Sequence, residues 1–162
     1  MTRILVTALL ALCLTTSGAF ATSLVELVQR DGVFYEKFKD VPFSGEADQG
    51  AWRGVLKNGK FEGPWVIYYE NGRLWHEGAY KNGKQEGPWL WYHDNGQLWS
   101  EGAYKNGKFE GPWVAYYDDG QLWSKGTYKN GKFEGPWVAY REDGTKVEVS
   151  SGIYRNDVKV SD

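Results

Sequence analysis

The chain has 162 residues, with 19 Lys and Arg against 21 Asp and Glu, which gives a formal net charge of −2. This length fits a single domain, and the near-neutral charge excludes a general electrostatic attraction to nucleic acid. Aromatic residues are unusually frequent, since nine Trp and eleven Tyr exceed what a small core needs. Any fold predicted for this chain has to accommodate them.

Residues 1–21 have the features of an export signal. Arg3 supplies a short positive region, residues 4–14 are apolar, and Ala19-Phe20-Ala21 has the small-residue pattern of a cleavage site. The apolar run is too short to span a bilayer, so we predict a signal peptide and no membrane span in the mature chain. Cleavage near Ala21 would give a soluble periplasmic or extracellular protein. It would also remove Cys13, the only cysteine, so no disulfide is expected.

Residues 22–56 are interpreted as a divergent N-terminal repeat that caps one end of the array that follows. Asp31-Gly32 lies between two short apolar runs and predicts a hairpin. Residues 42–45 resemble the Phe-Glu-Gly-Pro sequence found later in the chain. Terminal repeats of such arrays are commonly atypical.

Residues 57–155 consist of tandem 24-residue repeats, which fix the architecture. Asn-Gly or Asp-Gly dipeptides recur at alternating spacings of 13 and 11, beginning at residues 58, 71, 82, 95, 106, 119, 130 and 143. Such dipeptides suit the two positive-φ positions of a type I′ hairpin turn, and the segments between them have no helical period. The prediction is an all-β repeat protein, an elongated antiparallel β-meander of stacked hairpins in a single-layer curved sheet. Residues 156–162 are expected to form a charged C-terminal tail that ends the sheet.

A two-residue loop at Asn71-Gly72 would set the register of the repeat. It places Trp65 opposite Gly78, and it places Tyr68 opposite Trp75. Alternation along the strands then predicts one apolar face, which includes Trp65, and one mixed face, which includes Tyr68. The Trp rings are expected to cover strand glycines, and a bulge or kink is expected at Pro64, Pro88, Pro112 and Pro136.

The pattern Gly-x-Tyr-Lys-Asn-Gly-Lys-x-Glu-Gly-Pro-Trp-x-x-Tyr-x-x-Asn-Gly-x-Leu covers roughly residues 31–155 and resembles the variant MORN repeat. The chain is more closely similar to bacterial proteins of the YwqK-type antitoxin family. This resemblance implies an array of β-hairpins. It also implies a binding role, with a toxin as the partner, but no particular site.

No set of residues in the sequence predicts catalysis, a cofactor or a metal site. His76 and His93 fall well over 10 Å apart in the predicted register, at roughly 3.4 Å per residue, which is too far for one metal ion. Glutamates recur at equal steps, which favours a solvated row over a unique acid–base pair: Glu62, Glu86, Glu110 and Glu134. We therefore predict that the protein is not an enzyme.

Two surface features are candidate interaction sites. The first is an aromatic strip on the mixed face, in which Tyr and Trp are expected to pair across each hairpin: Tyr68, Trp75, Tyr92, Trp99, Tyr116 and Trp123. Such pairs stabilise a hairpin by roughly 0.2–1 kcal/mol, so a structural role is the alternative to binding. The second is a basic rim along one edge of the sheet: Lys57, Lys60, Lys81, Lys84, Lys105, Lys108, Lys129 and Lys132.

The opposite edge is expected to be acidic: Glu70, Asp94, Asp118, Asp119, Glu142 and Asp143. Solubility and protection from aggregation account for such rims without a ligand. A row of lysines would alternatively bind an anionic polymer or membrane surface. For the whole protein we predict an exported, non-catalytic module for protein–protein binding or scaffolding, with cell-wall glycan binding and toxin neutralisation as alternatives.

Overall fold

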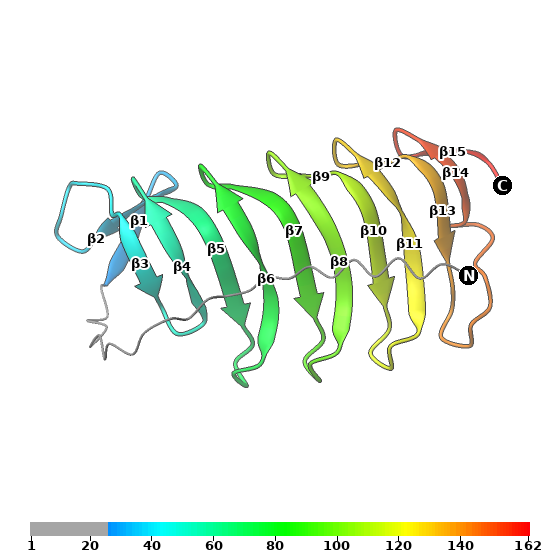
Figure 1. Cartoon of the computed structure of the whole chain (residues 1–162), viewed down its shortest axis with the longest axis horizontal. Coiled ribbons are helices and arrows are strands. Elements are labelled where there is room, and N and C mark those ends of the chain that lie inside the picture. The colour runs from blue at the N-terminus through cyan, green and yellow to red at the C-terminus, as the bar shows by residue number, and fades with distance from the viewer. Residues whose placement is uncertain (1–25) are drawn as a thin grey trace.

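The computed structural model describes residues 26–162, and they form one long row of β-hairpins (Figure 1). The predicted signal peptide, residues 1–21, lies outside the described residues. The strands are β1 (Leu27–Arg30), β2 (Val33–Glu36), β3 (Gly45–Asp48), β4 (Trp52–Lys57), β5 (Lys60–Tyr68), β6 (Leu74–Lys81), β7 (Lys84–Tyr92), β8 (Leu98–Lys105), β9 (Lys108–Phe109), β10 (Gly111–Tyr116), β11 (Leu122–Lys129), β12 (Lys132–Phe133), β13 (Gly135–Ala139), β14 (Gly152–Arg155) and β15 (Val158–Ser161).

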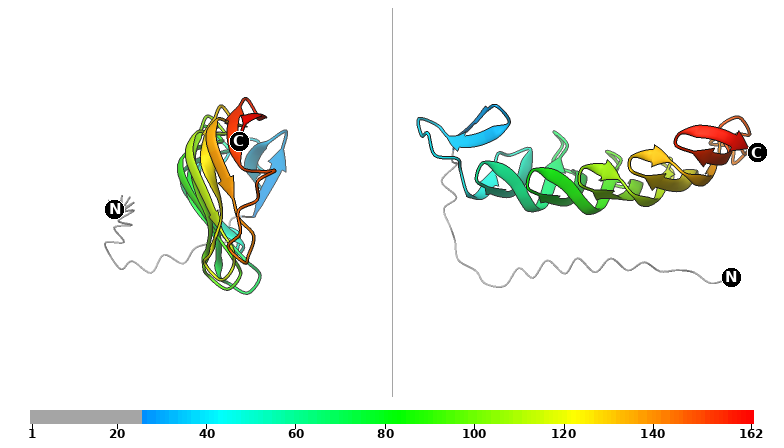
Figure 2. Two further views of the ribbon diagram at one scale, coloured as in Figure 1. Left: turned by 90° about the vertical axis from the view of Figure 1, so that its right-hand side faces the viewer. Right: turned by 90° about the horizontal axis from the view of Figure 1, so that it is seen from above.

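Strands β3 to β15 form a single 13-stranded antiparallel sheet whose spatial order follows the chain order. Strands β9 and β10 together correspond to the unbroken β5 and β7, as do β12 and β13. The strands twist strongly, and seen from above they follow one another like the turns of a coil (Figure 2). The predicted all-β, single-layer meander is confirmed. Residues 158–161 of the expected tail form β15, the last strand of this sheet.

The Lys-Asn-Gly-Lys turns have the predicted type I′ conformation. In the turn between β6 and β7, Asn82 and Gly83 have φ of 51° and 77°, and the turns at residues 58, 106 and 130 are alike. Each turn is also fixed to the preceding hairpin. The backbone N–H of Asn82 donates to Oε2 of Glu62 at 2.7 Å, and that of Gly83 donates to the carbonyl of Phe61 at 2.9 Å.

This anchoring contradicts the expected solvated row of glutamates. Glu62 is half-buried beneath the next turn, and the same bond recurs with Glu86, Glu110 and Glu134 as acceptors. Each carboxylate gives a turn amide of the next hairpin a hydrogen-bond partner within the protein. The glutamates therefore join successive repeats.

The loops at the opposite edge differ from the prediction. In the loop after β5 only Gly72 has positive φ; Asn71 does not. The N–H of Gly72 donates to the carbonyl of Tyr69, the geometry of a longer loop that ends in a bulge. The register consequently shifts by one residue near the loop, so Tyr68 pairs with Leu74 and the predicted pairing with Trp75 is wrong.

Farther from the loop the predicted register is confirmed, because Trp65 pairs with Gly78. The bulges at the prolines are also confirmed. Beside Pro88, the ladder between β6 and β7 passes from the Ala79–Glu86 pair to the Glu77–Leu90 pair and so sets three residues of β7 against one residue, Gly78, of β6. For this reason Gly78 does not pair with Gly87, and Gly87 adopts a φ of 75° at the bulge.

Each Trp ring covers a strand glycine, as predicted, and this glycine belongs to the preceding repeat. A Cβ added at Gly78 would overlap the ring of Trp89, and one added at Gly102 would lie 2.8 Å from Cδ1 of Trp113. A side chain at Gly102 would therefore meet Trp113 of the next repeat and not Trp89. Trp89 is only 1% exposed. We call the face that carries Trp65, Trp89, Trp113 and Trp137 the Trp face.

Aromatic contacts on the Trp face continue through the sheet and into the N-terminal hairpin. Phe61 lies 4.1 Å from Trp65 and 5.0 Å from Tyr80, measured between ring centroids. At the N-terminal end, Phe34 of β2 lies 5.2 Å from Phe61 and 6.2 Å from Trp52. The β1–β2 hairpin, blue in Figure 2, thus packs against the first rings of the array.

Candidate binding groove

A groove of about 990 Å³ runs along the sheet from β5 to β13. It is lined by each Trp and each strand Gly together with the residues that flank them, such as Pro64 and Val66 on β5 and Glu77 and Ala79 on β6. Because side chains alternate along a strand, the flanking residues point away from the ring of Trp65. We call this surface the groove face. It corresponds to the mixed face of the sequence prediction.

One row of directly paired residues crosses the groove from β5 to β13. In strand order this central row consists of Val66, Glu77, Leu90, Glu101, Val114, Lys125 and Val138. Apolar and charged side chains alternate along it. Its charges change sign once, from two glutamates to a lysine. The register of the repeats generates this row, which the sequence pattern alone did not single out.

Tyrosines of the predicted strip lie beside the central row. The hydroxyl of Tyr92 donates to Oε1 of Glu77 at 2.9 Å. Burial, this hydrogen bond and the charge of Glu77 raise the pKa of Tyr92 to about 12. Burial and the charge of Glu101 also raise the pKa of Tyr116. Both phenols are therefore neutral hydrogen-bonding groups at physiological pH.

The tryptophans of the strip have ring partners other than those predicted. Trp75 lies 5.7 Å from the ring of Tyr69, and Trp123 lies 6.2 Å from that of Tyr117. Trp99 lies 6.3 Å from His93. The one-residue shift at the loop breaks the predicted pairing within the hairpin. Trp75 and Trp123 remain 40% and 39% exposed, so both rings are accessible to a partner.

The ring partners of these tryptophans link one repeat to the next, which the sequence analysis missed. The hydroxyl of Tyr69 donates to the carbonyl of Tyr92 at 2.7 Å, and Tyr117 reaches Tyr140 in the same way at 2.8 Å. Between them, Nε2 of His93 lies 3.0 Å from the carbonyl of Tyr116. The signal in the sequence is a Tyr or His that stands two residues before the first three Asn-Gly or Asp-Gly dipeptides of this edge; Arg141 holds that position before the fourth.

The lysines of the basic rim face each other in pairs. Lys81 pairs with Lys84 across its hairpin, and the same holds at the other three turns. All eight are exposed, and none belongs to an ion pair formed within residues 26–162. Like charges directly opposite each other destabilise a sheet. The nearby glutamates accept hydrogen bonds from turn amides instead.

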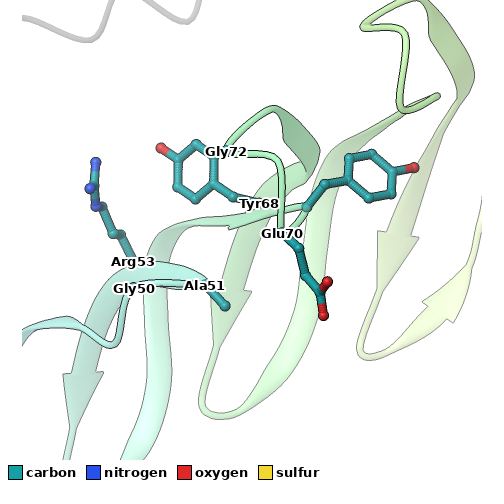
Figure 3. Close-up of a pocket in the computed structure, with 7 residues that line it drawn as sticks. Gly50, Ala51, Arg53, Tyr68, Glu70 and Gly72 are labelled. Carbon is teal, nitrogen blue, oxygen red and sulfur yellow. The ribbon is translucent and has the colours of Figure 1, made fainter.

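A smaller hollow of about 380 Å³ lies at the N-terminal end of the groove face. Arg53 lies 5.3 Å above the ring of Tyr68, and its Nε is 2.7 Å from Oδ2 of Asp48. Figure 3 shows Arg53 and Tyr68 on one side of the sheet, with Glu70 pointing the other way. Since Arg53 pairs with Val66, it extends the central row by a charge that already has a partner.

The two histidines occupy unrelated surroundings. His76 lies against Trp75 at 4.7 Å and Trp89 at 5.8 Å, and burial lowers its pKa. Its Nδ1 is buried and has no hydrogen-bond partner among the described residues. No group of three or more metal-binding side chains occurs in the part of the chain that the structure describes. In the same residues there is no helix long and apolar enough to cross a membrane.

Residues 61–82, 85–106 and 109–130 match the MORN repeat variant. The chain carries three tandem MORN repeats. Their limits coincide with the hairpin period of the sheet, and repeats of this kind commonly mediate protein or membrane binding. No curated protein matches the chain.

One solved structure with a similar chain is described as "Crystal structure of GtfA/B complex bound to UDP and GlcNAc". The two chains are 15% identical with a TM-score of 0.21, and the match covers 77% of this chain and 24% of the other. This chain thus spans about a quarter of the length of that one. A likeness at this level carries no argument about function.

Proposed function

We propose that the protein is a non-catalytic module that binds a partner protein along the groove face. The observation that carries the proposal is the groove itself, which extends over successive MORN repeats. Its apolar residues, such as Val66, Leu90 and Val114, are left half-exposed, and contiguous exposed apolar surface marks interaction sites. Neutralisation of a toxin, the role implied by the resemblance to the YwqK-type family, would be one form of such binding.

Two properties of the groove support binding over catalysis. Apart from Lys125, each repeat presents similar groups at equal steps, so among the described residues the polar side chains of the groove are spread along its length. The walls are also held firmly, because turn anchors and ring contacts join every repeat to the next. A firmly held surface loses little conformational entropy when a partner binds.

Capture of a partner with matched variants tests the proposal. Val114→Lys places a charge in the middle of the groove, whereas Val149→Lys makes the same change in a loop outside it, where Val149 is 81% exposed. We expect partner recovery from an extract of the producing cells to fall at least about tenfold for Val114→Lys only, the loss of a well-packed contact. Equal recovery by both folded variants would refute the groove as the binding site.

Two further experiments test the proposals of glycan binding and of export. Purified peptidoglycan as bait tests the glycan-binding alternative, and recovery from the periplasmic or culture fraction tests export. Export is proposed from the signal-like residues 1–21. If the protein is made but stays in the cytoplasm, that proposal fails.

A second candidate function is attachment to an anionic surface through the basic rim. It is favoured by the four opposed lysine pairs, which have no carboxylate partner in the described residues. Binding to anionic vesicles should weaken steeply as salt is raised, because exposed charges are screened. Binding that is unchanged between low and high salt would contradict it.

A further inference from the structure

The repeat geometry sets a length that any ligand lying along the groove has to match. Charged positions of the central row occur on every second strand, at Glu77, Glu101 and Lys125. Neighbouring strands are roughly 4.7–4.9 Å apart, so successive charges are spaced by roughly 9.4–9.8 Å. A ligand that presents the same face at that interval can contact every repeat alike.

Among regular peptide conformations, polyproline II fits this interval best. It has three residues per turn and rises 3.1 Å per residue, so one face recurs every roughly 9.3 Å. An α-helix presents one face every seven residues, or roughly 10.5 Å, and drifts by about 1 Å per repeat. A β-strand alternates its faces with a period of two residues, so every third residue does not face the groove.

The signs of the charges restrict the ligand further. Glu77 and Glu101 are acidic, and Glu77 accepts a hydrogen bond from the hydroxyl of Tyr92. Lys125 takes the place of a third acid and is exposed. Apolar residues separate these charges, so that Leu90 and Val114 offer packing surface between them. Proline rings in the polyproline II conformation are suited to such surfaces.

We infer that the groove face binds a proline-rich partner segment in the polyproline II conformation, with cationic residues at positions i and i+3 and an acidic residue at i+6. The cations would lie over Glu77 and Glu101, and the acid over Lys125. This inference rests on the proposed function and names the chemistry of the partner. The distance between every second strand determines the three-residue period of the ligand, and the charges of the central row determine the order of the charges on the ligand.

Binding of synthetic peptides to the full-length chain tests the inference. The probe is a fluorescent nonamer, Pro-Pro-Lys-Pro-Pro-Lys-Pro-Pro-Glu. Its control, Pro-Lys-Pro-Lys-Pro-Glu-Pro-Pro-Pro, has the same composition with charges two residues apart. We expect the first peptide to bind more tightly, by about two- to fivefold for each ion pair that the control cannot form. Equal affinities would overturn the three-residue period.

A charge exchange tests the register of the charges. Lys125→Glu should reverse the preference at the last position, so that this variant prefers a nonamer ending in Lys by about two- to fivefold. Glu142→Gln, on the acidic edge outside the groove, should leave the preference of the original protein unchanged. If Lys125→Glu shows no reversal, the assignment of the acid to Lys125 is wrong.

The outcomes separate this inference from the proposed function. If neither nonamer binds but capture of a partner is still lost in Val114→Lys, the groove binds protein of another conformation and the inference fails alone. A helical peptide that displaces the partner from the groove would likewise reject the polyproline II inference and leave the proposed function standing. If Val114→Lys captures the partner as well as the original protein does, both the proposed function and this inference fail. Binding of soluble oligosaccharides in place of peptides would also reject both.

Discussion

At the scale of single residues, the fit between Trp and Gly is the tightest feature of the sheet. Each Trp ring lies on the glycine of the preceding repeat, and added Cβ atoms would meet these rings at different distances. At Gly126 and Gly78 a Cβ would overlap the rings of Trp137 and Trp89, whereas at Gly102 the approach is 2.8 Å. The three sites therefore form a graded series.

We expect Gly126→Ala and Gly78→Ala to lower the free energy of unfolding by about 1–3 kcal/mol, the usual cost of overpacking. Gly102→Ala should cost less, because Trp113 has to move by only a few tenths of an ångström. Urea unfolding followed by Trp fluorescence measures all three. Equal effects at the three sites would show that the rings do not lie on these glycines.

His76 gives a prediction about pH. Because burial lowers its pKa, the unfolded chain takes up a proton before the folded chain does as the pH falls. Stability should therefore be complete above about pH 6.5, the ordinary histidine value, and should fall as the pH drops below it. His76→Ser copies the corresponding Ser100 and Ser124, which are buried. This variant should lose that pH dependence while His93 is retained, as urea unfolding between neutral and mildly acidic pH would show.

At the scale of structural elements, hairpins are joined by side chains that cap the next turn. Oε2 of Glu86 accepts from the backbone N–H of Asn106 at 2.8 Å. Glu86→Ala removes this bond from an exposed turn amide and should cost about 0.5–1.5 kcal/mol, the usual net worth of a hydrogen bond. Glu86→Gln keeps an acceptor and should recover part of the loss. If both variants unfold like the original protein, Glu86 does not anchor the turn.

Turns also show what the sequence could and could not predict. Regular Asn-Gly and Asp-Gly spacing was enough to predict the meander and the Trp65–Gly78 register, and the prolines predicted the bulges. The spacing did not distinguish the two classes of loop, because Asn-Gly fits both a type I′ turn and a longer loop with glycine at its end. The residue before the dipeptide is lysine at one edge and acidic at the other, as with Lys81 and Glu70. That difference was the available signal.

The aromatic strip was mispredicted for the same reason. A shift of one residue at the loop after β5 separates Tyr68 from Trp75 and brings Trp75 to Tyr69. The inter-repeat bonds of Glu62 were out of reach of the sequence because they depend on how consecutive hairpins stack. Periodicity predicts which residues share a face, whereas contacts between neighbouring repeats depend on the twist of the sheet.

For the whole molecule, the repeat of 24 residues is the unit of folding. Deleting residues 85–108 joins Lys84 to Phe109 in the same phase, so turn anchors and ring contacts can re-form with the next repeat. Such a variant should unfold cooperatively, with lower stability and a smaller denaturant slope, as repeat arrays do. Deleting residues 85–96 removes half a unit and should prevent folding, as circular dichroism would show. Equal folding of the two variants would contradict the assignment of the unit.

The whole array also brings together what no single repeat contains, which is a continuous groove with an ordered row of charges. The central claim is that a partner protein lies along this groove. Photo-crosslinking from a light-reactive residue at Val114, with Val149 as the control position, tests it most directly. We expect a covalent adduct with the partner from position 114 and none from position 149. Crosslinking of the partner from position 149, with none from position 114, would contradict it.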